Sequence, residues 1–279
     1  MKTFNKSKLQ SVALRCAAYI AGLLTVGVLL CLVVYILIKG VPHLSLDLFS
    51  LKYTSENVSL FPALINTVTM TLLSLLIAVP LGIFSAIYLV EYARRGNKLV
   101  SVVRITAETL SGIPSIVYGL FGFLLFVTTL GFGYSLLAGA LTLAIMILPV
   151  IMRTTEEALI SVPDSYREGS FGLGAGKLRT IFKIVLPSAM PGILAGVILS
   201  VGRIVGETAA LIYTAGSVAQ IPDNLMGSGR TLSIHLYALW TEGLNTEQSY
   251  ATAVVLLFIV IGLNALSAFV AKRLGKGKV

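Results

Sequence analysis

Long runs of residues without charge dominate this chain of 279 residues. A helix that crosses a bilayer needs about 20 apolar residues, because the hydrocarbon core is about 30 Å thick and a helix rises about 1.5 Å per residue. Five stretches reach this length with at most two charged residues each, namely 16–38, 62–90, 110–152, 184–222 and 248–271. The bilayer is therefore the solvent in which this chain must fold.

The third stretch, 110–152, is too long for one helix because it holds 43 residues. Its middle reads Gly-Phe-Gly-Tyr at 131–134, and glycines placed in this way mark turns. We therefore expect two helices joined by a tight turn, which makes an all-α membrane protein with six transmembrane helices. Prolines inside the spans should bend or break helices locally; they are Pro80, Pro114 and Pro149. Two glycine pairs should let a neighbouring helix approach span five closely; they are Gly192/Gly196 and Gly202/Gly206.

The distribution of Lys and Arg predicts the orientation. Of the 21 Lys and Arg residues, 17 fall in the N-terminal tail, the loops after spans two and four, and the C-terminal tail, whereas three fall on the opposite side. Because basic loops mark the cytoplasmic side, both termini are expected in the cytoplasm. This pattern also explains the net charge of +9 without nucleic acid as a partner. We expect the first span to be retained, because its apolar core is longer than that of a signal peptide.

The longest polar stretch on the predicted inner side runs from Arg153 to Lys183. Ser161 or Asp164 is suited to cap a short helix there, and a glycine-rich turn should follow that helix. This glycine cluster is not a nucleotide site. A P-loop needs Ser or Thr after its Gly-Lys pair, and Leu178 stands in that place. A partner must therefore supply any ATP site.

The same loop carries a recognisable spacing. The residues Glu168-Gly169-Ser170, Gly174, Ile184, Leu186 and Pro187 resemble the EAA signature of permease subunits of bacterial ABC importers, with Glu-Gly-Ser in place of Glu-Ala-Ala. In that family the loop is a coupling helix that docks in a groove of the ATPase subunit. The resemblance implies that the 161–187 segment does the same here. The predicted coupling residues are Arg167, Glu168, Gly174, Ile184, Leu186 and Pro187.

Other segments resemble a narrower group, the permeases of phosphate importers. The matching ranges are 108–122, 153–159 and 202–210, and the run 206–215 favours the A-type over the C-type subunit. The resemblance implies the type I ABC-importer permease architecture in a bacterial inner membrane. It also implies one transmembrane domain over 1–279, with a cytoplasmic coupling loop at 153–190. Its implied partners are a second permease subunit, two ATPase subunits that use the ATP, and an extracytoplasmic phosphate-binding protein. The chain itself would bind no cofactor and no metal, and it would not be an enzyme.

Two charged residues lie inside predicted span five, independently of any family. Arg203 is near its middle, and Glu207 follows four residues later, on the same face if the helix continues. A charge at the bilayer centre costs about 2.5–3.5 kcal/mol on insertion scales, so we expect the two to neutralise each other. We predict that this face lines a substrate pathway, where the guanidinium would bind a tetrahedral oxyanion. The alternative is a purely structural pair. Thr208, Ser111 and Ser115, from the resembling segments, complete the predicted pathway set.

Three other functions are weighed against phosphate import. A permease for sulfate or molybdate would share the same architecture. An ion-coupled secondary transporter would also use an intramembrane Arg and Glu, but the sequence has no evident inverted repeat. For an intramembrane enzyme, the sequence shows neither a metal-binding motif nor a nucleophile motif in support. The two histidines, His43 and His235, are expected at the surface or an interface on the outer side.

Overall fold

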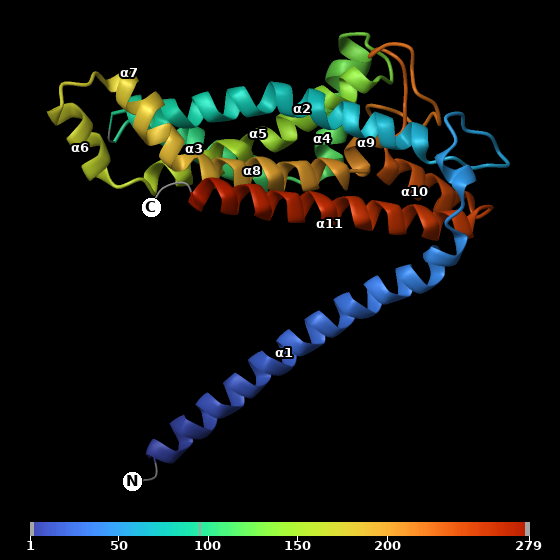
Figure 1. The fold of residues 1–279 in the computed structure, drawn as a ribbon, viewed down its shortest axis with the longest axis horizontal. Coiled ribbons are helices and arrows are strands. Elements are labelled where there is room, and N and C mark those ends of the chain that lie inside the picture. Colours follow the sequence, from blue (N-terminus) through green and yellow to red (C-terminus); the bar gives the residue numbers. More distant parts are fainter. Residues whose placement is uncertain (1–2, 95, 277–279) are drawn as a thin grey trace.

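The computed structural model describes residues 3–94 and 96–276, and helices dominate it (Figure 1). The elements in chain order are α1 (Thr3–Gly40), the 3-10 turns η1 (Val41–His43) and η2 (Leu46–Phe49), α2 (Phe61–Ile87), the π-helix η3 (Tyr88–Tyr92), α3 (Lys98–Ser111), α4 (Ser115–Gly122), the π-helix η4 (Phe123–Thr129), α5 (Leu136–Ile160), α6 (Asp164–Gly172), α7 (Lys177–Thr180), the π-helix η5 (Ile181–Val185), α8 (Leu186–Val205), α9 (Ala209–Ile212), α10 (Leu232–Glu242) and α11 (Thr246–Lys276).

Among the described residues, five helical segments are long and apolar enough to cross a membrane, and they contain α1, α2, α5, α8 and α11. A sixth span exists if α3 and α4 are counted as one broken helix, since these two helices meet at a bend of 103°. The predicted turn at 131–134 is confirmed, with φ of +69° at Gly131 and +64° at Gly133.

The prediction that Pro114 bends or breaks its helix locally is confirmed. Helix α3 ends at Ser111 and α4 begins at Ser115, with Pro114 in an extended conformation before it. Proline has no N–H to donate and disfavours the α conformation in the residue before it, so the break falls where the sequence places Gly112 and Pro114. Pro80 and Pro149, in contrast, lie inside the continuous helices α2 and α5.

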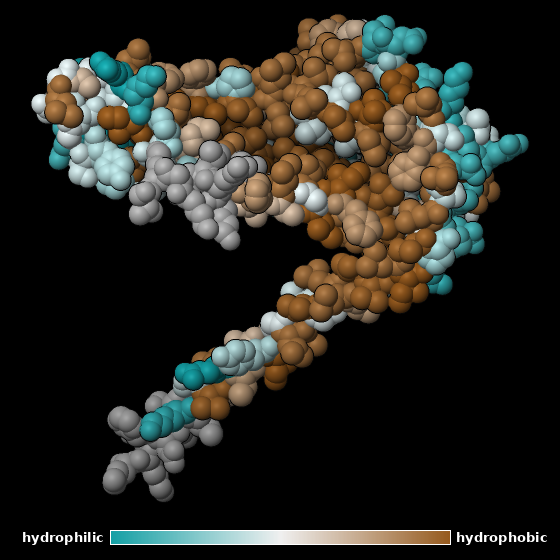
Figure 2. Space-filling model, in the orientation of Figure 1, coloured by the Kyte–Doolittle hydropathy of each residue, from teal (hydrophilic) through white to brown (hydrophobic). Residues whose placement is uncertain are grey.

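Helix α5 is the most buried span and forms the centre of the bundle. Its side chains Leu143, Met146, Ile147 and Ile151 are fully buried, and Met70 of α2 packs into the same cluster. The brown surface of Figure 2 shows that apolar side chains also cover the outside of the bundle. A chain that is apolar both inside and outside is suited to a lipid solvent.

The glycine pairs of α8 behave differently from each other. At Gly192 a Cβ would lie 2.7 Å from the Cβ of Ala158, and at Gly196 it would collide with Thr154, so α8 lies close against α5 as predicted. At Gly202 no atom of residues 3–94 or 96–276 outside its own helix turn lies within 4 Å of that position. The prediction of close packing is therefore confirmed for the first pair and wrong for the second within this chain.

Helix α1 packs against the bundle at its C-terminal end. There the hydroxyls of Tyr35 and Tyr250 lie 3.2 Å apart, and Gly40 allows α1 to approach the backbone of α11. From this point α1 diverges from the bundle (Figure 1), and none of the residues in the apolar window that marks it as a span is buried.

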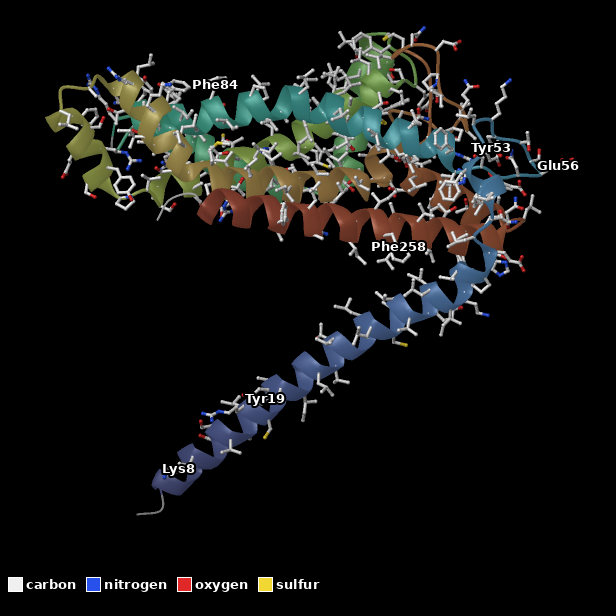
Figure 3. The ribbon with its side chains drawn as sticks, in the orientation of Figure 1. Lys8, Tyr19, Tyr53, Glu56, Phe84 and Phe258 are labelled. Carbon is white, nitrogen blue, oxygen red and sulfur yellow. The ribbon has the colours of Figure 1, made fainter. Side chains whose placement is uncertain are left out.

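The end of the bundle opposite α6 is covered by residues 41–60, residues 216–231 and α10, which we call the outer cap. Tyr53 lies at this end in Figure 3. His235, at the start of α10, is fully buried in the cap, so its expected place at a surface or interface is wrong. Its ring meets the ring of Tyr53 edge-on, with 6.1 Å between the centroids. Burial first, and then the positive charge of Arg230, lower the pKa of His235 to about 3, although the Val58 backbone acts in the opposite direction.

This lowered pKa of His235 predicts acid sensitivity. Below the ordinary value of 6.5 the unfolded chain binds a proton at His235 that the folded chain does not, so stability falls as the pH drops from 6.5 toward 3. At pH 5 the loss from this residue is about 2 kcal/mol. The melting temperature of the purified protein should therefore fall less between pH 7 and pH 5 in His235→Asn than in the wild type. The exposed His43, 3.3 Å from Glu247, supplies the control: His43→Asn should keep the wild-type acid sensitivity. Equal pH dependence in wild type and His235→Asn would contradict this account.

Candidate functional site

The predicted pathway residues of span five lie at a break in that span. Helix α8 ends at Val205, Gly206 follows it, and the short α9 begins at Ala209. The expectation that the helix of span five continues through Glu207 is therefore wrong. Arg203 is half-buried in the last turn of α8, whereas Glu207 is 8% exposed and stands beyond the helix end.

The helix end changes what Glu207 does. Its Oε1 atom accepts a hydrogen bond of 3.0 Å from the backbone N–H of Ala210, and so caps the first turn of α9. Within the described residues no ion pair within 4.0 Å joins Arg203 to Glu207. The expected mutual neutralisation is thus not formed in this structure. The acidic side chain instead satisfies a helix N-terminus, where negative charge is favourable.

The second break, between α3 and α4, lies near this one. The hydroxyl of Tyr118 in α4 donates a hydrogen bond of 2.8 Å to the carbonyl of Leu110 in α3, across the bend. Arg203 is close enough for its charge to act on the Tyr118 hydroxyl. The half-buried Ser111 and Ser115 flank the bend, and the Ser111 hydroxyl donates a hydrogen bond of 2.7 Å to the Glu108 carbonyl. The two breaks therefore bring α4 and the end of α8 together.

Helices α4 and α9 meet at a glycine. A Cβ at Gly119 would lie 2.7 Å from the Cα of Ala210 and 3.1 Å from its carbonyl oxygen. Backbone atoms cannot move aside as a flexible side chain can, so only glycine fits this contact. This close approach holds α9, and with it Glu207 and Thr208, against α4.

Gly119→Ala should therefore destabilise the protein by about 1–3 kcal/mol, the usual cost of overpacking. The expected result is a lower melting temperature in detergent and less chain in the membrane. Gly202→Ala is the matched control, because in the part of the chain that the structure describes no neighbouring element lies within 4 Å of the added methyl group. Equal melting temperatures for the two variants would contradict the close contact.

A cavity of about 660 Å³ opens beside the second break. Of the five predicted pathway residues, Thr208 lines it, whereas Arg203, Glu207, Ser111 and Ser115 do not. Its other lining side chains are mainly apolar. They include Ile116 of α4, Ala209 and Ile212 of α9, Trp240 of α10 and Ile36 of α1. The cavity therefore lies where α1 diverges from the bundle, on the side of the bundle that faces α1.

The second candidate region is the 161–187 segment. The predicted short helix is confirmed as α6, but the expected caps are wrong. Its N-cap is Pro163 without a side-chain hydrogen bond, and Asp164 is its first residue. The Ser161 hydroxyl instead donates to the carbonyl of Ala158 at the end of α5. The first turn of α6 begins instead with the backbone hydrogen bond of 3.1 Å from the N–H of Tyr166 to the carbonyl of Pro163.

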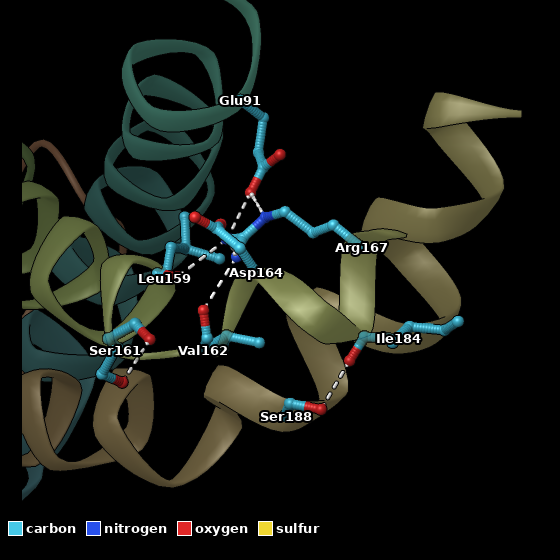
Figure 4. Close-up of polar contacts among 9 residues, drawn as sticks. Glu91, Leu159, Ser161, Val162, Asp164, Arg167, Ile184 and Ser188 are labelled. Carbon is cyan, nitrogen blue, oxygen red and sulfur yellow. Dashed lines mark hydrogen bonds and ion pairs between the residues drawn. The ribbon is translucent and has the colours of Figure 1, made fainter. Parts of the chain in front are cut away.

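Arg167 points into the protein and anchors α6. Its Nε and Nη2 atoms donate to Oε1 of Glu91 over 3.1 and 2.8 Å (Figure 4). Its Nη1 and Nη2 atoms also donate to the carbonyls of Val162 and Leu159. The side chains of Arg167 and Glu91 are 15% and 8% exposed. This buried pair fixes α6 to the end of the second span, and Glu91 is a functional candidate that the sequence analysis missed.

The other predicted coupling residues surround the turn after α6. Glu168 is exposed, and Gly174 has a φ of +78°, which favours glycine. Ile184 is half-buried in η5, while Leu186 and Pro187 begin α8. The Glu-Gly-Ser departure from the signature has a structural role, because the buried Ser170 hydroxyl lies 2.8 Å from that of Thr180 and ties α6 to α7.

Large apolar side chains are exposed on the same segment. They are Tyr166, Phe171, Leu173, Leu178 and Phe182, and Leu173 is 92% exposed. Arg179 and Lys183 line a small hollow of about 290 Å³ beside them. An exposed apolar patch with a polar rim is typical of a protein–protein contact.

The family model described as "Binding-protein-dependent transport system inner membrane component" matches residues 78–278. The chain belongs to this family. It is therefore a multi-pass inner-membrane transport component, whose family places substrate binding and ATP hydrolysis on partner proteins.

Relatives of this transport component extend over most of its length. It is 37% identical to the probable ABC transporter permease protein YqgI of Bacillus subtilis (strain 168), covering 82% of this chain and 81% of the relative. It is 39% identical to the phosphate transport system permease protein PstA of Pasteurella multocida (strain Pm70), covering 84% of this chain and 85% of the relative. It is 40% identical to the phosphate transport system permease protein PstA 1 of Mycobacterium tuberculosis (strain CDC 1551 / Oshkosh), covering 76% and 71%.

Solved structures confirm the fold of this inner-membrane component. An inward-facing structure of the MetNI methionine ABC transporter aligns with a TM-score of 0.61 at 21% identity, covering 77% of this chain and 94% of that one. A bacterial alginate ABC transporter aligns with a TM-score of 0.60 at 17% identity, covering 91% and 95%. The predicted ABC-importer permease fold is therefore confirmed.

Proposed function

We propose that this chain is the A-type pore subunit of an ATP-driven importer of inorganic phosphate. The observation that carries the proposal is the similarity to phosphate transport system permease proteins, at about 40% identity over most of the chain. The complex would contain a second permease subunit, two ATPase subunits and an extracytoplasmic phosphate-binding protein.

Helix α1 supports a second permease subunit. Large apolar side chains along α1 are exposed, among them Leu14, Tyr19, Leu23, Leu29 and Leu32. The cavity of about 660 Å³ opens on the same side of the bundle. A second subunit seated between α1 and α11 would cover both, and would close the cavity into a pathway between the two permeases.

The apolar patch on α6, α7 and η5 supports an ATPase partner at the other end. Because Arg167 ties α6 to Glu91 at the end of the second span, a movement of α6 would be passed on to that span. ATP binding would draw the ATPase subunits together and open the cavity outward, and hydrolysis would reset it.

Arg203 is the residue that would meet the anion. Its guanidinium is half-buried at the end of α8 and forms no ion pair within 4.0 Å among the described residues. Guanidinium donors match the geometry of a tetrahedral oxyanion. Thr208 would contribute from the cavity wall, Ser111 and Ser115 would contribute from the bend in the third span, and Glu207 would hold α9 in place.

Uptake of radiolabelled phosphate at micromolar concentration tests the proposal in the native host, with and without this chain. Any redundant phosphate importer is deleted first, and sulfate and molybdate are measured alongside. Loss of phosphate uptake alone, restored by the wild-type chain, is expected. Unchanged phosphate uptake together with loss of sulfate or molybdate uptake would contradict phosphate as the substrate and leave the importer architecture in place.

A further inference from the structure

We propose that the outer cap binds a small inorganic anion beside Arg230, at a site separate from Arg203. Arg230 directly precedes α10 and is 4% exposed. Its guanidinium carbon lies 4.8 Å from the centre of the Tyr53 ring. The proposal stands on the side chains that surround this buried cation, and it does not depend on which solute the importer carries.

Arg230 lacks the partners that a buried cation needs. Its Nε and Nη2 atoms are buried and have no hydrogen-bond partner among the described residues. No carboxylate among those residues forms an ion pair with it within 4.0 Å. Arginine stays protonated in proteins, and buried charges are normally paired and hydrogen-bonded. The two free donor atoms therefore point to a negatively charged ligand.

Other polar atoms without partners gather around the same place. They are the hydroxyl of Thr231, the Oδ1 atom of Asn66 and the ring nitrogens of His235, although the Val58 backbone lies close enough to act on one of those nitrogens. Of these, the hydroxyl of Thr231 can donate a hydrogen bond to an anion. Asn66 Oδ1 is an acceptor, and it would accept a hydrogen bond from Arg230 or from water. The Asn66 amide already donates to the carbonyls of Gln220 and Arg230, which places it in this cluster.

The backbone adds to the positive field. Thr231 is the N-cap of α10, a helix of 11 residues whose first turn begins beside Arg230. The N–H of Leu232 already donates to the Thr67 hydroxyl over 2.9 Å, so the helix dipole is what favours an anion at this end. Because the pKa of His235 lies at about 3, the imidazole is neutral at physiological pH. It offers one N–H group and cannot balance the charge of Arg230.

The burial of the cluster limits the size of the ligand. With Arg230 at 4% exposure, Thr231 at 2% and His235 at 0%, a carboxylate on a partner protein could not reach it without opening the cap. Halides and small oxyanions share the required chemistry, which is one negative charge and several acceptor positions. A halide and phosphate are therefore the two sources to distinguish.

The test uses the complex of permease and ATPase subunits without the phosphate-binding protein, purified in gluconate, with Arg203→Gln present throughout so that pathway binding is removed. Binding of ³⁶Cl-chloride and of ³²P-phosphate is measured by equilibrium dialysis, and the melting temperature is followed as chloride, phosphate or sulfate is added. One bound anion per chain, with a saturable rise in melting temperature, is expected. The anion that saturates at the lower concentration identifies the ligand.

Arg230→Gln should lose this binding and at least nine-tenths of the rise in melting temperature. Lys52→Gln, which removes an exposed positive charge from the same cap, should keep both. Arg230→Lys, which keeps the charge and loses the fork of donors, should bind with saturation at a higher concentration, and it serves as the variant if Arg230→Gln does not fold. Absence of bound label in the Arg203→Gln complex, or equal binding in the Arg230 variants and the Lys52 control, would overturn the proposal. If the importer carries a solute other than phosphate, the results expected for Arg230 stay the same.

Discussion

Replacing Arg203 by glutamine is expected to lower the rate of phosphate uptake by about ten- to a hundredfold while the complex still assembles. Hydrogen bonds to charged groups contribute about 1.5–3 kcal/mol each, and every 1.4 kcal/mol is a factor of ten. The effect should be large because Glu207 does not neutralise the charge of Arg203 through an ion pair. The carboxylate is engaged by the N–H of Ala210, which leaves the guanidinium for the anion.

Two controls distinguish a pathway role from a structural one. Arg203→Lys keeps the charge without the planar fork, and it should fall between the wild type and Arg203→Gln. Lys98→Gln removes an exposed positive charge at the start of α3 that forms no ion pair within 4.0 Å among the described residues, so it should transport normally. Normal uptake by Arg203→Gln at normal membrane abundance would leave Arg203 with a packing role only.

Breaking the buried pair of Glu91 and Arg167 is expected to have the second large effect. Removing one partner of a buried ion pair typically costs about 3–5 kcal/mol, because the other charge stays buried and unpaired. Arg167→Ala also removes the donors to the Leu159 and Val162 carbonyls. We expect α6 to lose its fixed position, so that both phosphate uptake and phosphate-stimulated ATP hydrolysis fall together.

The matched control for this pair is Asp164→Asn. Asp164 also accepts a hydrogen bond from Arg167, over 3.2 Å, but its side chain is 76% exposed. It should therefore change transport little. A double variant, Glu91→Gln with Arg167→Met, leaves no unpaired charge and should recover melting temperature relative to Arg167→Ala. If Arg167→Ala and Asp164→Asn behave alike, the buried pair does not position α6.

The periodic and compositional features of the sequence predicted most of the fold. Uncharged runs marked the spans, because each span must satisfy its own backbone and cover itself with apolar side chains in lipid. The glycines at 131–134 predicted the turn, since a positive φ is accessible to them at no steric cost. The glycines at 172–176 predicted the turn after α6, which a positive φ at Gly174 confirms.

Features that depend on where a helix stops were harder to predict. The expected pairing of Arg203 and Glu207 assumed that residues four apart share one helix face, and α8 ends at Val205, between them. Gly206 is a weak signal for that break, because glycine is common in membrane helices. The partner of Arg167 leaves no local pattern in the sequence, since Glu91 is 76 positions away. The burial of His235 leaves no local pattern either.

The most direct test of the account is transport by the purified complex in proteoliposomes. The complex, with its ATPase subunits, is reconstituted with ATP inside the vesicles or without it, and accumulation of ³²P-phosphate is measured with and without the phosphate-binding protein. We predict accumulation that requires ATP and the binding protein, that sulfate does not inhibit, and that Arg203→Gln reduces at least about tenfold. Phosphate accumulation driven by an ion gradient without ATP, or ATP-driven uptake of another solute in place of phosphate, would contradict it.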